Sequence, residues 1–422
     1  MSDRNHDLRD RVRTTRAAAR ALAALRPGDR TRGLDAMAAA LRSHASDILA
    51  ANADDVRRAE ASGTAAAMID RLALTPARIE GMASAIDTIA RQPDPVGERL
   101  QETRRPNGLR VAKQRIPLGL ILMIYEARPN VTSDAAALCL RSGNGVVLRG
   151  GRDACASNAA IGAVLRSALQ AADLPADAIL VLSDLAREDL QTLLEMDDLL
   201  DLAIPRGGPG LIRQVRAWSK VPTIQHYMGN CHVYLHEDAP VDRSVEIVRN
   251  AKVSRPSVCN ALETLLVHQD AVERLLPALG RALALDGVRW HACPRAMPAL
   301  TAAGADVIAA KDEDWETEYL SLDLAVRVVP SLEAAAEHIQ TWGSGHTEAI
   351  VTDSLAATQA FLDAVDSSCV MINASTRFAD GGELGLGAEI GISTSKLHAY
   401  GPMGATELTT TRFVVTGEGH IR

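Results

Sequence analysis

The 422-residue chain has few aromatic residues, no long hydrophobic run and no excess of positive charge. Phe, Trp and Tyr make up only 3% of it, and Ala, Leu, Val and Ile supply the apolar mass, which favours alternating helices and strands over an all-β fold. No apolar stretch reaches the roughly 18 residues that span a membrane, and the first residues lack a signal-peptide core. A net charge of −8 gives little support for nucleic-acid binding. We therefore expect a cytoplasmic protein whose partners include no nucleic acid and no membrane.

The six cysteines lie far apart, and none belongs to a Cys-x-x-Cys pair. This spacing argues against a zinc site and against a disulfide framework, so no metal is expected. Five of the six are interpreted as inert packing residues, because free Cys is among the most buried residue types. The exception is Cys259, which lies between a predicted helix, Val241–Ser254, and a predicted buried strand, Leu262–Val267. A thiol at such a junction can face a cleft, where a thiolate nucleophile would be placed.

The apolar pattern divides the chain into segments. Residues 5–92 have helical spacing, and residues 100–113 carry Asn107-Gly108 between extended flanks, a strong hairpin signal. A strand is predicted over Ile116–Tyr125, and strands then alternate with helices to about residue 230, among them helices Arg187–Glu195 and Pro209–Trp218. A second alternating set, which contains helix Leu332–Trp342, follows from 231 to about 372. Such alternation predicts doubly wound parallel sheets. Residues 407–416 are β-like and are expected to pair with the hairpin or with another subunit.

Two glycine-containing segments follow predicted strands. The run Ile204-Pro-Arg-Gly-Gly-Pro-Gly-Leu211 opens a predicted helix, so glycine backbone and a helix N-terminus could together approach a phosphate. It is not a Gly-x-Gly-x-x-Gly fingerprint, and a tight turn without a ligand is an equal alternative. In Val147-Leu-Arg-Gly-Gly-Arg152, Arg149 would meet a nucleotide phosphate or remain a solvated charge.

Two further segments carry polar residues suited to chemistry. Tyr125-Glu-Ala-Arg-Pro-Asn-Val131 closes a buried strand, where α/β active sites form. Asn130 can donate an amide N–H to a developing oxyanion, but an N-cap on the helix predicted from Val131 is a strong competing role. Residues 373–389 form a polar, glycine-rich loop whose Arg377 suits bidentate capture of a carboxylate or phosphate. His398, downstream, is interpreted as structural.

Several motifs, in order, resemble the γ-glutamyl phosphate reductases, a branch of the aldehyde dehydrogenase superfamily. They are Tyr125–Thr132, Leu148–Gly151, Ile204–Gly208, Gly229–His232, Arg255–Asn260, Leu320–Asp323, Asn373–Phe378 and Lys396–Ala399. The resemblance implies an α/β, aldehyde-dehydrogenase-like fold with two doubly wound α/β domains and a small β oligomerisation arm. The corresponding ranges are an NADP-binding domain (1–99 and 120–229), a catalytic domain (230–400) and the arm (100–119 and 401–422). It also implies a homo-oligomer.

The resemblance also implies site residues. Cys259 is the nucleophile, and Asn130 with the backbone N–H of Cys259 forms the oxyanion hole. Glu318 falls where the superfamily places a glutamate on the nicotinamide ribose. The other residues expected to bind the cofactor are Arg149, Gly150, Arg206, Gly207 and Gly208. Those expected to bind the substrate are Arg128, Ser375 and Arg377.

The reaction that the resemblance implies is the NADPH-dependent reduction of γ-glutamyl phosphate to glutamate 5-semialdehyde and phosphate through a cysteine thioester, the second step of proline biosynthesis from glutamate. A transient contact with glutamate 5-kinase is expected. Hydrolytic relatives need a glutamate base upstream of the cysteine, but superfamily spacing leads here to Gln225, whose amide cannot accept a proton at neutral pH. This favours the reductase over two alternatives, an NAD⁺-dependent hydrolytic dehydrogenase and a nucleotide-binding scaffold without chemistry.

Overall fold

A computed structural model describes residues 3–183, 185–186, 189–225 and 228–422. The chain forms two compact units, the first made of residues 1–226 and 385–422 and the second of residues 227–384. No helix in the described ranges is both long enough and apolar enough to cross a membrane.

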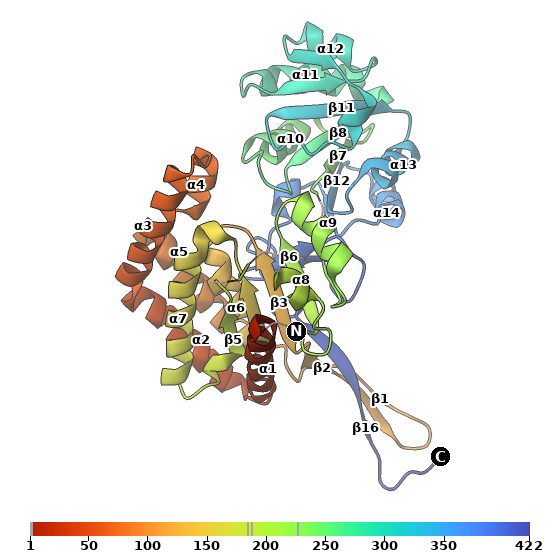
Figure 1. Cartoon of the computed structure of the whole chain (residues 1–422). Coiled ribbons are helices and arrows are strands. Elements are labelled where there is room, and N and C mark those ends of the chain that lie inside the picture. Colours follow the sequence, from red (N-terminus) through yellow and green to blue (C-terminus); the bar gives the residue numbers. More distant parts are fainter. Residues whose placement is uncertain (1–2, 184, 187–188, 226–227) are drawn as a thin grey trace. The chain divides into compact units, whose positions relative to one another are not determined.

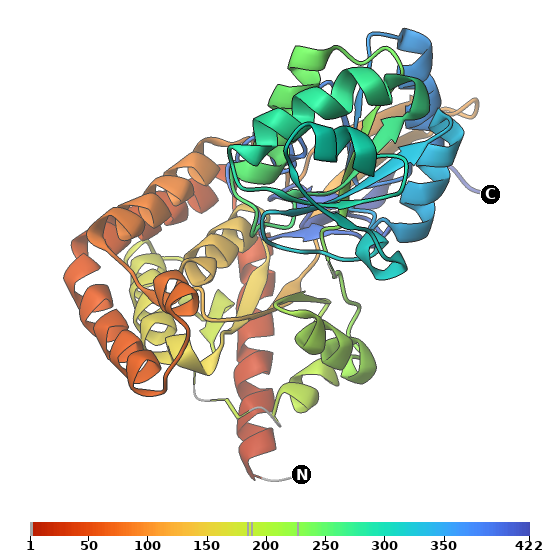
Figure 2. The same ribbon diagram turned by 90° about the horizontal axis from the view of Figure 1, so that it is seen from above.

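The first unit begins with five helices (Figures 1 and 2), which confirms the helical prediction for residues 5–92. Their bounds are α1 (Asp3–Ala23), α2 (Pro27–Ser43), α3 (Ala45–Ala61), α4 (Ala66–Leu72) and α5 (Pro76–Arg91). Local chemistry sets the start of α5, because the Thr75 hydroxyl accepts the Arg78 N–H and Pro76 occupies the first turn, where no N–H is needed.

A four-stranded parallel sheet with strand order β5-β4-β3-β6 forms the centre of this unit. The strands are β3 (Leu120–Tyr125), β4 (Gly145–Arg149), β5 (Ile179–Val181) and β6 (Leu202–Arg206). The connecting helices are α6 (Asn130–Arg141), α7 (Cys155–Ala171), α8 (Asp189–Leu194) and α9 (Pro209–Trp218); the predicted start of α8 at Arg187 lies outside the described residues. The chain runs from β3 to β5 on one side and then crosses to β6, so β3 and β6 flank a topological switch point.

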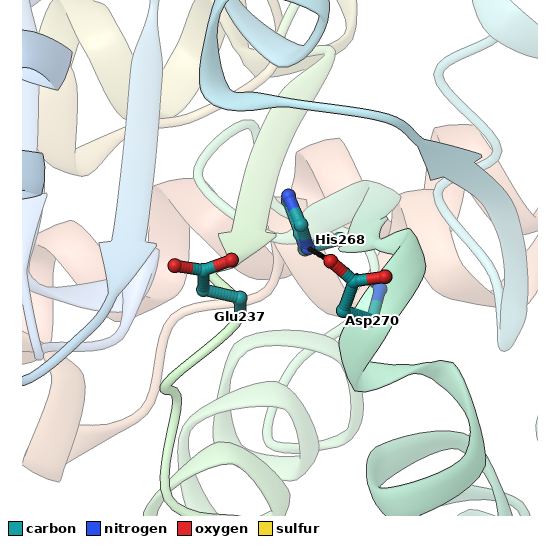
Figure 3. Close-up of side chains that lie close together, drawn as sticks. All are labelled: Glu237, His268 and Asp270. Atoms are coloured by element: carbon teal, nitrogen blue, oxygen red, sulfur yellow. Dashed lines mark hydrogen bonds and ion pairs between the residues drawn. The ribbon is translucent and has the colours of Figure 1, made fainter.

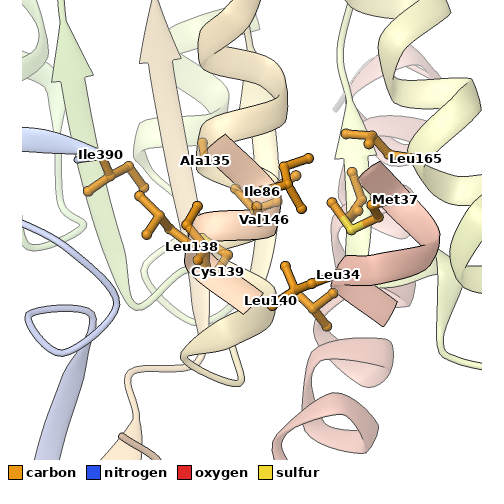
Figure 4. Packing of buried hydrophobic residues seen from close by; sticks show 14 of the residues in the cluster. Leu34, Met37, Ile86, Ala135, Leu138, Cys139, Leu140, Val146, Leu165 and Ile390 are labelled. Atoms are coloured by element: carbon orange, nitrogen blue, oxygen red, sulfur yellow. The ribbon is translucent and has the colours of Figure 1, made fainter. Parts of the chain in front are cut away.

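Each face of this sheet is covered by its own apolar cluster. Side chains of α2, α5, α6 and α7 pack on one face (Figure 4), among them Leu34, Met37, Ile86 and Leu138. On the other face, Leu8 and Val12 of α1 pack with residues of α8 and α9. Helices on both faces explain why β3 is buried along its whole length.

The predicted strand from Ile116 to Tyr125 is wrong in its first part. Strand β2 (Arg110–Pro117) ends before Leu118-Gly119, and β3 starts at Leu120. Gly119 has φ +131°, and a Cβ there would lie 2.1 Å from Oδ2 of Asp201. The same oxygen accepts the Leu120 N–H at 2.7 Å. This contact with a residue far along the chain separates two strands that appear continuous in sequence.

Three antiparallel strands, β1 (Arg99–Arg104), β2 and β16 (Thr409–Thr416), form a separate sheet in the order β1-β2-β16. We call this sheet the arm (Figure 1). The Asn107-Gly108 hairpin is confirmed, with Gly108 at φ +94° and the Arg105 N–H bonded to the Leu109 carbonyl at 2.7 Å. Of the two alternatives for residues 407–416, the structure shows pairing with the hairpin of the same chain. A short ladder of β14 (Gly391–Ser393) and β15 (Gly401–Met403) completes the unit's strands among the residues described.

The second unit contains a seven-stranded parallel sheet with the order β10-β9-β11-β8-β7-β12-β13. Its strands are β7 (Cys231–Leu235), β8 (Leu262–His268), β9 (Arg289–Ala292), β10 (Asp306–Ala309), β11 (Asp323–Val329), β12 (Thr347–Val351) and β13 (Cys369–Ile372). Its helices are α10 (Val241–Val253), α11 (Val272–Ala284), α12 (Met297–Ala302), α13 (Leu332–Trp342) and α14 (Leu355–Ala364). One apolar cluster lies between the sheet and α10 and α11, and another lies between the sheet and α13 and α14. This unit is therefore also doubly wound.

Candidate active site

The Cys259 loop connects α10 to β8, as the sequence predicts. Cys259 is half-buried and stands at the amino end of β8. Its carbonyl oxygen accepts a hydrogen bond from the Sγ–H of Cys231 at 3.2 Å, and the Ala261 N–H bonds to the Val258 carbonyl at 3.0 Å. These contacts fix the backbone around a thiol that remains partly accessible.

The polar loop that contains Arg377 packs against the Cys259 loop. The Asn260 side-chain amide donates to the carbonyls of Arg377 (3.3 Å) and Ala379 (3.0 Å), and the Thr376 hydroxyl donates to the Asn260 carbonyl at 2.7 Å. The Arg377 guanidinium donates to the Asn260 side-chain oxygen and, at 3.3 Å, to the Ser254 hydroxyl. Arg377 therefore supports the residues that flank Cys259.

Ser375 has a structural contact of its own. It is buried, and its hydroxyl accepts the Arg377 N–H at 3.3 Å. This bond caps the short 3₁₀ helix Thr376–Phe378.

Gly229 brings Glu318 and Cys259 together at the amino edge of the sheet. Its N–H donates to Oε1 of Glu318 at 2.9 Å. A Cβ on Gly229 would lie 1.8 Å from the carbonyl oxygen of Cys259, so only glycine permits this approach. Burial raises the pKa of Glu318, and the Gly229 N–H opposes that shift. The Glu318 carboxylate and the candidate nucleophile are thus held on one backbone junction.

A buried ion pair lies behind this junction. Nζ of Lys252 is 2.6 Å from Oε2 of Glu263, and both side chains are fully buried. Oε1 of Glu263 accepts the Leu320 N–H at 3.2 Å, which ties the pair to the segment that carries Glu318. Burial lowers the pKa of Lys252 and raises that of Glu263 to about 7. Sequence analysis did not identify this pair; the available signal was one Glu inside a mainly apolar strand, eleven positions after a Lys.

The thiol of Cys231 differs from that of Cys259. It is fully buried, and desolvation, together with nearby carboxylates such as Glu348, raises its pKa well above the ordinary value. Cys231 therefore stays protonated and can donate to the Cys259 carbonyl. Glu348 in turn accepts the backbone N–H of His232 at 2.8 Å and lies 2.9 Å from its ring nitrogen Nδ1.

In the first unit, Asn130 is exposed and is the first residue of α6. The alternative of an Asn130 N-cap is wrong, because Pro129 occupies the cap position and the Asn130 amide instead donates forward to Oδ2 of Asp134 at 3.0 Å. Burial raises the pKa of Asp134 to about 6. One N–H of the Asn130 amide is engaged by this carboxylate, which orients the group.

The residues predicted to bind the cofactor follow the carboxyl ends of β4 and β6. Arg149 and Gly150 stand at the end of β4, and a Cβ on Gly150 would lie 2.1 Å from Nδ2 of Asn158, so the turn packs tightly. Arg206 is the last residue of β6 and is half-buried.

The Gly207–Gly208 turn already holds a carboxylate. Oε1 of Glu126 accepts the Gly208 N–H at 2.8 Å and would lie 2.8 Å from a Cβ on Gly207. Sequence analysis did not single out Glu126. Arg128, two residues on, is exposed.

Glu237, His268 and Asp270 form a group whose ligand atoms lie within 4.8 Å of one another (Figure 3). His268 is the last residue of β8, and Glu237 and Asp270 follow β7 and β8, at the sheet edge opposite Cys259. Nδ1 of His268 accepts the Asp270 N–H at 3.3 Å and so caps a short 3₁₀ helix. This contact gives His268 a structural role at the end of β8.

Comparison with known proteins identifies relatives over nearly the whole chain. The sequence pattern of the aldehyde dehydrogenase family matches residues 2–285. A γ-glutamyl phosphate reductase of Anaeromyxobacter sp. (strain Fw109-5) is 54% identical over 405 residues, which cover 96% of this chain and 95% of that protein. One from Xanthomonas campestris pv. campestris (strain B100) is 52% identical over 407 residues, covering 96% and 97%.

Solved structures also match nearly the whole chain. The crystal structure of γ-glutamyl phosphate reductase from Thermotoga maritima matches with a TM-score of 0.95 at 40% identity, covering 98% of this chain and 99% of that one. An acetylating aldehyde dehydrogenase from Geobacillus thermoglucosidasius has the same fold, with a TM-score of 0.68 at 18% identity over 99% of this chain and 98% of that one. The expected aldehyde-dehydrogenase-like fold is confirmed.

Proposed function

Because the chain belongs to the aldehyde dehydrogenase family and, within it, to the γ-glutamyl phosphate reductases, we propose that it reduces γ-glutamyl phosphate to glutamate 5-semialdehyde and phosphate. The proposed hydride donor is NADPH, and the proposed reaction is the second step of proline biosynthesis. The observation that carries the proposal is the half-buried Cys259 at the amino end of β8, on a backbone that Cys231 and Gly229 hold in place.

In this mechanism, the Cys259 thiolate attacks the acyl carbonyl of γ-glutamyl phosphate, and phosphate leaves with the bonding electrons of the C–O bond, which produces a thioester. The Asn130 amide and the Cys259 backbone N–H are assigned to the oxyanion that develops on that carbonyl; each such donor is worth roughly 3 kcal/mol in the barrier. When bound, NADPH would supply the hydride that reduces the thioester. Collapse of the resulting thiohemiacetal returns Cys259 and releases the semialdehyde.

The residues available for the cofactor fit a phosphate-bearing dinucleotide. Arg149 and Arg206 stand at the carboxyl ends of β4 and β6, on either side of central β3, and β3 with β6 forms the switch point where such ligands bind in open α/β sheets. Because Glu126 already accepts the Gly208 N–H and lies beside Gly207, and Asn158 lies beside Gly150, we assign the phosphates to the arginines, and the contacts of the three glycines with the cofactor stay predictions. Glu318 is assigned to the nicotinamide ribose.

The assigned domain roles remain proposals. Residues 1–99 and 120–229 would bind NADP(H), residues 230–400 would carry catalysis, and residues 100–119 and 401–422 would form an oligomer interface. The exposed Phe413 and Val415 of β16, with 73% and 57% of their surface accessible, support an intersubunit role for the arm. The substrate contacts of Arg128, Ser375 and Arg377, the transient contact with glutamate 5-kinase and the cytoplasmic location are likewise predictions.

One assay tests the reaction. The protein is incubated with NADP⁺ and the cyclised semialdehyde, with and without phosphate, beside Cys259→Ala. We expect NADPH to appear only when phosphate is present, because phosphate must take the acyl group from the thioester, and we expect Cys259→Ala to be inactive.

Equal rates without phosphate would instead identify a hydrolytic dehydrogenase. The amide at Gln225, where that class needs a carboxylate base, argues against this result. A fully active Cys259→Ala variant would refute the covalent step.

A further inference from the structure

The geometry points to a second binding site, for a small organic anion, in a cavity at the base of the arm. The cavity has a volume of about 360 Å³ and lies wholly within the first unit. Helix α1, the β2–β3 connection, Asp201 and β16 line it. Its size falls at the lower end of the roughly 300–1,000 Å³ of small-molecule sites.

The charge of the cavity is opposite to that of the chain. Four arginines line it, Arg16, Arg20, Arg115 and Arg412, against a single carboxylate, Asp201. The chain as a whole has a net charge of −8. Guanidinium groups stay protonated throughout the physiological range, so this concave surface concentrates positive charge and attracts anions.

Two of the four guanidiniums are matched by acids. Both carboxylate oxygens of Asp201 accept from Arg16, at 2.9 and 3.2 Å, and Nε of Arg115 lies 2.8 Å from Oε2 of Glu98. These pairs hold the two side chains in place at the cavity wall.

The other two guanidiniums lack such a match. Nε and Nη2 of Arg412 donate to the neutral Oε1 of Gln114, at 3.3 and 3.1 Å. Within the described ranges, neither Arg412 nor Arg20 is within salt-bridge distance of a carboxylate. Both residues are exposed, so water solvates their charge in the free protein. An anion would replace that water, because a guanidinium fork binds a carboxylate or a phosphate with two parallel hydrogen bonds.

Apart from Gln114, the remaining lining is apolar side chains and glycine, and it includes Ile116, Pro117 and Leu118. A ligand with a carboxylate or phosphate head and a short carbon body would satisfy both parts of the wall. Because Arg20 belongs to α1 and Arg412 to β16, such a ligand would tie the first helix to the last strand and stabilise the base of the arm.

The test uses the full-length protein, titrated separately with citrate and with inorganic phosphate at constant ionic strength, with hydrogen exchange followed by mass spectrometry. We expect slower exchange in peptides covering residues 110–117 and 409–416. In Arg20→Gln/Arg412→Gln the concentration needed for this protection should rise at least tenfold. The matched control is Arg57→Gln, which removes an exposed helical arginine that pairs with Asp54 away from the cavity, and it should behave as the wild type.

Phosphate is also a product of the proposed reaction, so the titration is repeated on Cys259→Ala. Protection of the arm should persist there even if the proposed function fails. Protection by citrate alone would identify a carboxylate ligand, and protection by phosphate alone would identify a phosphate ester. Absence of protection by both, or equal protection in the double-arginine variant, would overturn the site.

Discussion

Replacing Lys252 by Met tests whether the buried pair behind Gly229 holds the candidate site together. The substitution keeps the length of the side chain and removes Nζ, which lies 2.6 Å from Glu263 in surroundings without solvent. Breaking a buried pair by removing one partner destabilises a protein by about 3–5 kcal/mol, because the other charge is left uncompensated. Glu263 can relieve part of this cost by taking up a proton.

The pH dependence follows from the pKa of Glu263. Burial raises it to about 7 in the native protein, and the Lys252 charge is the main influence that lowers it, so it must rise further in Lys252→Met. The folded variant then binds a proton that the unfolded chain has released, which means that its stability falls as pH increases from the ordinary pKa of 4.5 through 7. Each pH unit in this window removes about 1.4 kcal/mol. Between pH 5.5 and 7.5 the free energy of unfolding of the variant should therefore fall by about 2–3 kcal/mol. The wild type, with a Glu263 pKa of about 7, loses stability over much of the same window, so the destabilisation relative to the wild type should be smaller at pH 5.5 than at pH 7.5 by about 1 kcal/mol.

Urea unfolding followed by tryptophan fluorescence measures this difference. Three of the four tryptophans, Trp290, Trp315 and Trp342, belong to the second unit, so the signal reports mainly on the unit that contains the pair. The control is Lys252→Met/Glu263→Leu, which removes both charges and should recover most of the lost stability. A single variant as stable as the wild type at both pH values, or a double variant less stable than the single one, would refute the reasoning.

Three other substitutions have defined outcomes. Gly229→Ala must displace the Cys259 carbonyl and should lower kcat/KM about 100-fold while the circular dichroism spectrum is retained; activity near that of the wild type would contradict the assigned geometry. Asp134→Asn removes a carboxyl whose pKa in the folded protein is about 6, so the wild type loses stability as the pH rises from about 4 to 6. Above pH 6 the free energy of unfolding of the variant, measured by thermal unfolding, should therefore exceed that of the wild type by roughly 1–2 kcal/mol. Arg30→Met leaves Asp94 buried without its partner at 2.8 Å and should cost about 3–5 kcal/mol in urea unfolding, whereas a change below 1 kcal/mol would show that water reaches the pair.

Elements with strong local signals were predicted well from sequence. Helices Pro209–Trp218 and Leu332–Trp342 have their predicted bounds, because apolar periodicity and a proline or serine at the start define them locally. The strand predicted from Ile116 failed at Gly119, where the chain turns to accommodate Asp201. No local pattern contains a contact between residues more than eighty positions apart.

Some residues of the candidate site could likewise be predicted from the sequence, and others could not. Cys259 could be identified because the helix before it and the strand after it are both evident in sequence. The Lys252–Glu263 pair could not be identified, because the sequence does not show which residue lies opposite a glutamate in a strand that is buried on both faces. Glu126 was also missed, because its bond to Gly208 joins the ends of two neighbouring strands.

The two units place their candidate residues at opposite ends of their strands. In the first unit, Arg149 and Arg206 follow strands β4 and β6, which is the usual arrangement in open α/β sheets. In the second unit, Gly229, Cys259 and Glu318 precede strands β7, β8 and β11, which lie side by side in the sheet. The rule that seeks polar residues after buried strands therefore finds the proposed cofactor residues and passes over the proposed nucleophile. At the carboxyl edge of the second sheet that rule leads instead to Glu237, His268 and Asp270, of which His268 caps a short 3₁₀ helix by accepting the Asp270 N–H. For this unit, the junction from helix to strand is the better guide, because contacts with Cys231 and Gly229 hold the backbone of Cys259 while the residue itself stays half-buried.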